Sequence, residues 1–156
     1  MAEPERPSRP HAVLFACGLN SVRSPMAAAL ARELLGKTLY VGSAGVQHGG
    51  EPDPFAAAAM AEVGIDISRH KPHTFEELEE LEGLNFDLIV TLSPQAHHRA
   101  LELTRTLGAE VEYWPTLDPT AIEGSREQRL DAYRAVRDEL MARIRERFGR
   151  SSSGNE

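Results

Sequence analysis

The sequence predicts an α/β protein in which helices cover both faces of a parallel sheet. Short apolar segments alternate along the chain with segments that carry helix-start signals, and this alternation is typical of parallel sheets. The first apolar segment, 11–16, has the uninterrupted apolar character expected of a strand buried on both faces. The 156 residues are enough for one domain whose core needs neither disulfides nor metal.

Capping residues mark the start of each predicted helix. A serine, threonine or aspartate that is followed by proline, or by glutamate or glutamine three residues later, is typical of a helix N-terminus. Such starts occur at Ser24-Pro25, Asp53-Pro54, Thr74 with Glu77, Ser93-Pro94 and Ser125 with Gln128. Glycine is typical just after a helix, and it indicates helix ends near Gly36, Gly64 and Gly108.

Apolar runs between these helices predict the other strands, at 39–41, 86–92 and 110–114. The last run alternates polar and apolar residues, as an edge strand does. The last helix should face the sheet with an apolar stripe made of Leu130, Tyr133, Val136, Leu140, Ile144 and Phe148. Residues 1–10 and 149–156 are polar, so we expect two disordered ends around a single domain at 11–148.

The charge and composition argue against several classes of function. The chain has 24 acidic and 17 basic side chains and a net charge of −7, which disfavours nucleic-acid binding and docking on an anionic membrane. No apolar run approaches the roughly 20 residues that span a bilayer. The polar residues 1–10 do not have the pattern of a signal peptide, so we expect a cytoplasmic protein.

The single cysteine cannot form an internal disulfide or a multi-cysteine zinc site, which excludes a disulfide-stapled extracellular fold. Two histidine pairs, His70 with His73 and His97 with His98, are the other candidate metal ligands. No cluster of cysteines or carboxylates accompanies them, so we expect surface histidines and neither a metal site nor a cofactor.

Reactive side chains follow the predicted strands. Cys17 follows the first strand and Ser43 the second, Thr91 and Ser93 lie at the end of the third, and Asp118 follows the fourth. Parallel strands end at one edge of a sheet, where ligands bind in such folds, so we expect these side chains to lie close together. A thiol, hydroxyls and a carboxylate at one edge indicate a reaction site.

The connection after the first strand has the pattern of a phosphate-binding loop, C-x5-R-S. Residues curled around a helix N-terminus can point several backbone N–H groups at one tetrahedral oxyanion, and Arg23 can bind two of its oxygens. The positive electrostatic field of the helix N-terminus and of Arg23 should hold Cys17 as a nucleophilic thiolate, to which Ser24 can donate a hydrogen bond. Asn20 tolerates the left-handed backbone that such a loop needs. The candidate anion-binding residues are Gly18, Leu19, Asn20, Ser21, Val22, Arg23 and Ser24.

Three of these residues also have plainer interpretations. Cys17 can be an inert buried cysteine, Asp118 a turn residue before proline, and Ser43 a turn serine. For Cys17, the position of the whole pattern between a buried strand and a capped helix favours the catalytic interpretation. For Asp118, the location at the carboxyl edge favours a functional one, and for Ser43 both interpretations stay open.

The sequence resembles the low-molecular-weight protein tyrosine phosphatase superfamily, which includes the thioredoxin-coupled arsenate reductases. Besides the loop, the resemblance lies in 40–45, 62–68, 114–119, 123–125 and 136–139, and the last four segments look like the arsenate reductase branch. It implies a three-layer α/β/α fold of the phosphotyrosine phosphatase I type, whose four-stranded parallel sheet has the order 2-1-3-4. The roles it implies are a nucleophile at Cys17, an oxyanion clamp at Arg23, a general acid at Asp118 and loop supports at Asn20, Ser24 and Ser43.

The chain also departs from the family pattern. Leu19 stands where the loop usually has glycine, so either its backbone is strained or the loop differs locally. Val22 and Ser93 stand where relatives have cysteines, which excludes an internal thiol cascade. Thr120 and Ala121 stand where the phosphatases have paired tyrosines, and we expect the loop 47–50 to line the pocket instead.

The leading interpretation is a cysteine-dependent phosphatase that acts on a phosphorylated protein or a small phosphomonoester. Cys17 would form a phosphocysteine, and Asp118 would protonate the leaving oxygen and then activate water. The loop would hold phosphate, sulfate or arsenate. The first alternative is an arsenate reductase that uses an external thiol, namely glutathione, mycothiol or a glutaredoxin-type protein. In the second alternative, Leu19 changes the loop so that it no longer supports catalysis. The protein is then a non-catalytic module that binds oxyanions or phosphopeptides.

Overall fold

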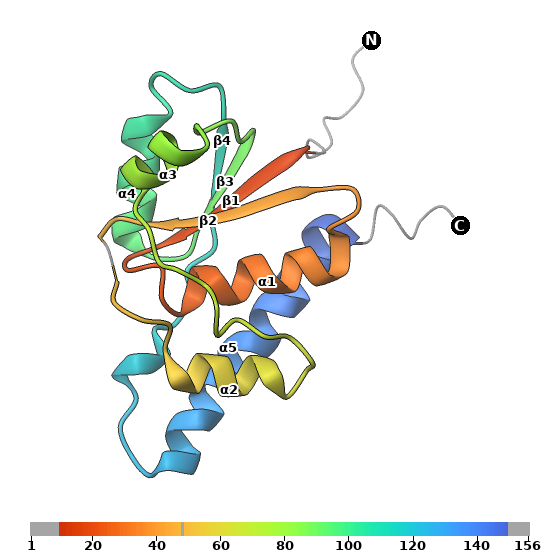
Figure 1. The fold of residues 1–156 in the computed structure, drawn as a ribbon, viewed down its shortest axis with the longest axis vertical. Coiled ribbons are helices and arrows are strands. Elements are labelled where there is room, and N and C mark those ends of the chain that lie inside the picture. The colour runs from red at the N-terminus through yellow and green to blue at the C-terminus, as the bar shows by residue number, and fades with distance from the viewer. Residues whose placement is uncertain (1–9, 48, 150–156) are drawn as a thin grey trace.

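A computed structural model describes residues 10–47 and 49–149 (Figure 1). Its sheet is parallel and four-stranded, in the order β2-β1-β3-β4, which confirms the predicted fold class and strand order. The strands are β1 (Ala12–Cys17), β2 (Tyr40–Gly45), β3 (Leu88–Thr91) and β4 (Glu110–Tyr113).

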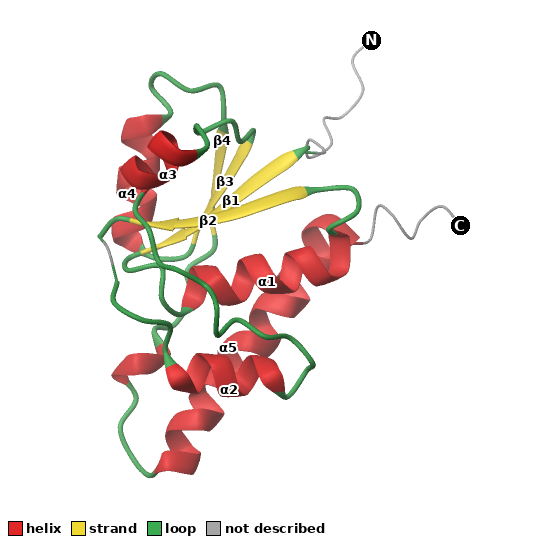
Figure 2. Ribbon diagram, viewed as in Figure 1, coloured by secondary structure: helices red, strands yellow, loops and turns green. Residues whose placement is uncertain are grey.

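Helices cover both faces of this sheet and complete the three layers (Figure 2). The helices on one side are α1 (Arg23–Leu35), α2 (Pro54–Ala61) and α5 (Arg126–Ile144). Those on the other side are α3 (Phe75–Leu81) and α4 (Pro94–Leu103). Two short helical turns are η1 (Pro119–Ala121) and η2 (Arg145–Gly149). No helix in the described part of the chain combines the length and the apolar character needed to cross a membrane.

The central strand β1 is buried on both faces, as its apolar sequence predicts. Val13 and Phe15 belong to the core cluster formed with α1 and α5, whereas Leu14 and Ala16 belong to the cluster formed with α3 and α4. This alternation follows from the two-residue period of a strand. The strand therefore places Cys17, a residue that is only 2% exposed, at the carboxyl edge of the sheet.

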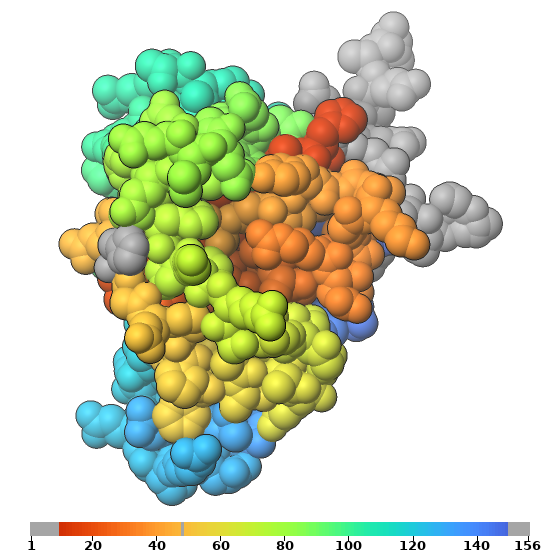
Figure 3. All heavy atoms as spheres, viewed as in Figure 1, coloured from red at the N-terminus to blue at the C-terminus, as the bar shows by residue number. Residues whose placement is uncertain are grey.

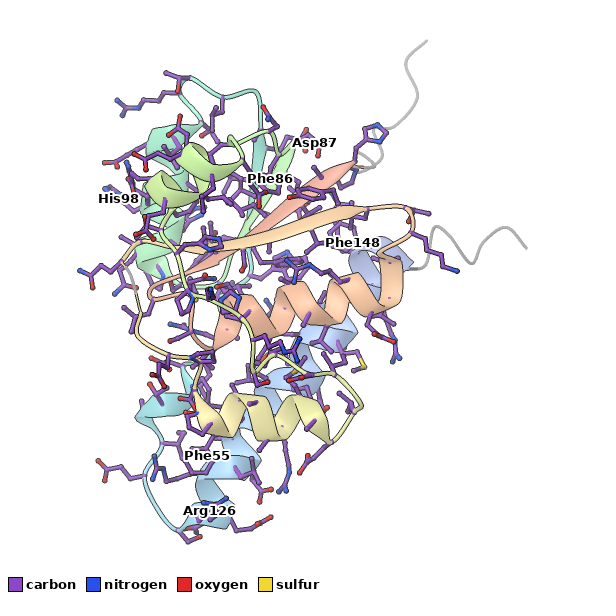
Figure 4. All side chains as sticks on the ribbon, in the orientation of Figure 1. Phe55, Phe86, Asp87, His98, Arg126 and Phe148 are labelled. Atoms are coloured by element: carbon purple, nitrogen blue, oxygen red, sulfur yellow. The ribbon has the colours of Figure 1, made fainter. Side chains whose placement is uncertain are left out.

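Helix α2 packs against α5 through a stacked pair of aromatic rings and a hydrogen bond. The rings of Phe55 and Tyr133 stack with their centroids 5.4 Å apart, and the hydroxyl of Tyr133 donates to Asp53 at 2.9 Å. The guanidinium of Arg126 lies 5.7 Å from the centre of the Phe55 ring, and Figure 4 labels both residues at the end of the molecule where α2 meets α5. These contacts position the N-terminal half of α5, which follows the connection that carries Asp118.

Four of the five predicted helix starts are confirmed by side-chain caps, at Asp53, Thr74, Ser93 and Ser125. The prediction for Ser24 is wrong. Helix α1 begins at Arg23, two residues before the predicted first helical residue Pro25, and its first turn has no side-chain cap. The hydroxyl of Ser24 lies instead 3.0 Å from the sulfur of Cys17, so it serves the loop rather than the helix end.

Some element boundaries also differ from the predicted ones. Strand β2 continues to Gly45, well beyond the predicted 39–41, because it pairs with β1 as far as Cys17. Helix α4 ends at Leu103, before the predicted end at Gly108. Gly149 lies in η2 rather than in the tail. Apart from Pro10 and Gly149, the residues predicted to form disordered ends lie outside the described residues.

Candidate active site at the carboxyl edge of the sheet

The carboxyl ends of the strands meet at one edge of the sheet, where a pocket of about 290 Å³ opens beside the loop 17–24. The pocket brings together the thiol of Cys17, the guanidinium of Arg23 and the carboxylate of Asp118. Its lining consists of Cys17, Gly18, Leu19, Ser21, Val22, Arg23, Val46, Gln47, Gln95, Asp118 and Thr120.

Other predicted edge residues lie outside this lining. Thr91 is buried, and its hydroxyl donates to the carbonyl of Glu112, while Ser93 is buried as the cap of α4. Gln47 lines the pocket as expected for the loop 47–50, whose residue His48 lies outside the described residues.

The first three carbonyl groups of the loop are hydrogen-bonded to residues that follow β2. The carbonyls of residues 17, 18 and 19 accept hydrogen bonds from the N–H groups of Val46, Gln47 and Gly49, at 3.2, 2.9 and 3.0 Å. Within the described residues, none of the N–H groups of 18–24 donates to a backbone carbonyl. These groups surround the N-terminus of α1, an arrangement that favours an anion.

Asn20 is a buried residue that stabilises the conformation of the loop. It is the one non-glycine residue with a positive φ, +60°, among those described, and it is fully buried. Its side-chain Nδ2 donates to the hydroxyl oxygen of Ser24 at 2.8 Å. Leu19 does not have a positive φ, because the left-handed position of the loop is taken by Asn20, which tolerates it.

Cys17 is enclosed but faces the pocket, so it is not packed only among aliphatic side chains. Its Sγ lies 3.0 Å from the Ser24 hydroxyl, which can donate a hydrogen bond to a thiolate. The arrangement suits a nucleophile better than an inert structural cysteine.

Arg23 and Asp118 flank the pocket. The Nη1 atom of Arg23 donates to the carbonyl of Thr116 at 2.9 Å, which fixes the guanidinium, and its Nη2 lies 3.9 Å from a carboxylate oxygen of Asp118. The other carboxylate oxygen of Asp118 accepts hydrogen bonds from the N–H and the hydroxyl of Thr120, at 3.0 and 2.7 Å. Asp118 therefore caps the turn η1, as a turn residue would, and also presents one oxygen toward Arg23.

Two histidines predicted to lie at the surface also form hydrogen bonds that support the loop. His70 Nε2 lies 2.9 Å from the carbonyl oxygen of Asn20 and 3.1 Å from its Oδ1. The N–H of His73 donates to the same Oδ1 at 3.0 Å, and its Nε2 lies 2.6 Å from the carbonyl oxygen of Ser43. The connection that carries both histidines, yellow-green in Figure 3, lies directly against the orange residues of α1 and β2.

His70 and His73 are half-buried, so the surface prediction holds only in part for them, whereas it is confirmed for His98, whose side chain is 81% exposed. His97 stacks on the ring of Tyr113. In the described residues, no group of three or more histidine, cysteine or acidic side chains could hold a metal ion. Ser43 contacts the loop support through its carbonyl, and the role of its side chain stays a prediction.

We expect protonation of His70 to weaken the fold as pH falls. Burial lowers the pKa of His70 below its ordinary value, so the unfolded chain binds this proton more readily than the folded one. The stabilising effect of the neutral ring is complete above the unfolded pKa of about 6.5 and is lost as pH falls toward the folded value. His70→Gln keeps an Nε2 donor for Asn20 but does not titrate, so it should reduce this loss.

Urea unfolding between about pH 5 and 8 measures the effect. The matched control is His98→Gln, because that side chain is exposed. An identical pH dependence of the free energy of unfolding in wild type and His70→Gln would contradict the prediction.

Comparison with known proteins agrees with this geometry. A family model described as low molecular weight phosphotyrosine protein phosphatase matches residues 12–150. An arsenate reductase of Halalkalibacterium halodurans is 37% identical over 85% of this chain and 91% of that protein. An arsenate reductase of Bacillus subtilis is 36% identical over 86% of this chain and 92% of that protein.

Solved structures with the same fold include both reductases and phosphatases. An arsenate reductase in the phosphate binding state has a TM-score of 0.68 at 29% identity, covering 86% of this chain and 94% of its own. A mutant of the YwlE arginine phosphatase with a phosphorylated active-site serine has a TM-score of 0.68 at 28% identity, covering 86% and 91%. Because the family model spans nearly the whole described chain, the chain belongs to the low molecular weight phosphotyrosine protein phosphatase family.

Proposed function

We propose that the chain is an arsenate reductase that takes its electrons from an external thiol. The observation that carries the proposal is the lone thiol of Cys17 beneath a loop whose free N–H groups and Arg23 suit a tetrahedral oxyanion. The named relatives that match most of the chain are arsenate reductases, which favours this alternative over the phosphatase that we preferred from the sequence.

The reaction would begin with attack of the Cys17 thiolate on arsenic. An S–As bond forms, and an oxygen of arsenate leaves as water once it is protonated, for which Asp118 is the nearby acid. The loop N–H groups and Arg23 would hold the remaining oxygens through this step.

The external thiol would then attack the sulfur of Cys17. An S–S bond forms, the S–As bond breaks, and its electron pair stays on arsenic, which leaves as arsenite. A second thiol cleaves the mixed disulfide and restores Cys17. Two thiols are oxidised to one disulfide while arsenic gains two electrons. Because the chain has a single cysteine, both reducing thiols must come from outside it.

The second candidate function is hydrolysis of a phosphomonoester, and the position of Asp118 favours it. The carboxylate lines the pocket beside Arg23 and is oriented by Thr120, as a general acid for a leaving alcohol should be. The same attack by Cys17 would then give a phosphocysteine, which water would hydrolyse. The non-catalytic alternative depends on a strained Leu19, and the φ angle of Leu19 is not positive, which argues against it.

One set of assays on the purified protein separates these functions. Arsenite is measured after addition of arsenate with glutathione, glutathione plus glutaredoxin, or mycothiol, and hydrolysis is measured with aryl phosphates. We expect arsenite to form only when a thiol donor is present. No arsenite with any donor, together with a phosphorylated Cys17 trapped by rapid quenching, would replace the reductase by the phosphatase. Oxyanion binding without either reaction would leave the non-catalytic module.

A further inference from the structure

The connection after β4 holds one side of the Arg23 guanidinium. The Nη1 atom of Arg23 donates to the carbonyl of Thr116 at 2.9 Å, whereas Nη2 lies 3.9 Å from Asp118, beyond hydrogen-bond distance. Among the described residues, no group accepts a hydrogen bond from Nε or Nη2. The side chain lines the pocket beside Cys17, so these two nitrogen atoms are available to a ligand there.

The shape of the guanidinium determines which of its edges suits an anion. The group is planar, and its N–H bonds have a fixed fork geometry. The N–H of Nε and one N–H of Nη2 run parallel along one edge, and two parallel donors match two oxygens of a tetrahedral anion. Since Nη1 already donates to Thr116, this is the edge on which both nitrogen atoms lack a partner among residues 10–47 and 49–149.

Thr116 is itself held firmly at the end of the sheet. Its N–H donates to the carbonyl of Leu92 at 3.2 Å, and its hydroxyl donates to the carbonyl of Trp114 at 2.8 Å. The N–H of Trp114 donates in turn to the carbonyl of Thr91, the last residue of β3, at 2.8 Å. Thr116 is also buried, so its carbonyl is a fixed acceptor for Arg23.

We propose that Thr116 is a positioning residue, whose backbone carbonyl holds Arg23 so that the Nε–Nη2 edge binds the oxyanion. The inference rests on the proposed function, because it assumes an oxyanion in the pocket. The Nη2 atom of this edge is also the one that lies 3.9 Å from Asp118, two residues after Thr116. One turn, 114–118, therefore orients the anion-binding edge and places the expected acid beside it.

An ester at the Thr116–Leu117 linkage tests the carbonyl without changing any side chain. Leu117→leucic acid, the α-hydroxy analogue of leucine, makes the Thr116 carbonyl a weaker acceptor. It also removes the N–H of Leu117, which donates to no group of the described residues. Isothermal titration calorimetry with inorganic phosphate gives the Kd, and thermal unfolding shows whether the variant is folded. We expect roughly two- to ten-fold weaker phosphate binding, the range of one net hydrogen bond, because Arg23 is held less firmly.

The matched control is Gly124→glycolic acid, an ester in the same connection between β4 and α5. The carbonyl of Glu123 and the N–H of Gly124 form no hydrogen bond with a described residue, and both residues are exposed. This variant should bind phosphate like the wild-type protein, because its ester lies away from Arg23 and outside the pocket lining.

The NMR signal of the Arg23 Nε–H group provides a second measurement should the Leu117 ester fail to fold. It is assigned by its absence from Arg23→Lys, and phosphate should shift it in the wild-type protein because this N–H contacts the anion. A wild-type Kd in the folded Leu117 ester, or an Nε–H signal that stays in place while phosphate binds, would overturn this inference alone. A wild-type protein that does not bind phosphate would overturn the proposed function as well.

Discussion

Cys17→Ser should abolish both arsenate reduction and phosphate-ester hydrolysis while leaving phosphate binding in place. A serine hydroxyl remains neutral near neutral pH and is a poor nucleophile without a base beside it, whereas the loop amides and Arg23 do not change. We expect a loss of roughly 10⁴-fold or more, in line with the removal of other catalytic nucleophiles. Arsenite formation, aryl phosphate hydrolysis and the phosphate Kd measure the two effects.

The binding measurement is the control, because it shows that the variant still has an intact loop. A Cys17→Ser protein that binds phosphate but keeps the wild-type rate would show that another group attacks the substrate. Since the chain has no other cysteine, it would also rule out thiol chemistry within this protein.

Asp118→Asn should slow hydrolysis of aryl phosphates by about 10²–10⁴-fold if Asp118 protonates the leaving oxygen. Asparagine keeps a side-chain oxygen that can accept the hydrogen bonds from Thr120, so the turn around residue 118 should persist. The loss should be larger for phenyl phosphate than for 4-nitrophenyl phosphate, because the nitrophenolate leaves with little help from a proton. The kcat for the two esters gives this comparison.

The matched control is Glu123→Gln, which also changes an exposed carboxylate to an amide in the connection before α5 but lies outside the pocket lining. It should keep the wild-type rates. Equal slowing of both esters by Asp118→Asn would indicate that the carboxylate only supports Arg23, which lies 3.9 Å away, and does not transfer a proton.

The sequence predicts the fold and the loop well because their signals are local. The caps at Thr74 and Ser125 depend on residues three positions away, and each forms the expected reciprocal hydrogen bonds. The C-x5-R-S pattern likewise lies within eight consecutive residues, so its strand, its turn and its helix can be recognised together. The left-handed backbone of Asn20 follows from its residue type.

The parts that sequence reasoning missed depend on contacts between distant residues. His70 and His73 reach Asn20 across about fifty positions of chain, and no spacing within their own segment indicates that partner. Gly49 and Gly50 are the same residue type, yet only Gly49 approaches Leu19 closely: a Cβ atom there would lie 2.6 Å from the Leu19 carbonyl oxygen. Ser24 differs from the predicted cap for another reason: serine before proline is typical of a cap, but here its hydroxyl lies 3.0 Å from the sulfur of Cys17.

The central claim is that the loop 17–24 binds a tetrahedral oxyanion directly above the sulfur of Cys17. Alkylation by iodoacetamide tests it cleanly, because the chain has one cysteine and intact mass spectrometry counts a single label. Phosphate and arsenate should slow the labelling of Cys17 in a saturable manner, whereas chloride at the same ionic strength should not. A labelling rate that neither phosphate nor arsenate changes would contradict the claim.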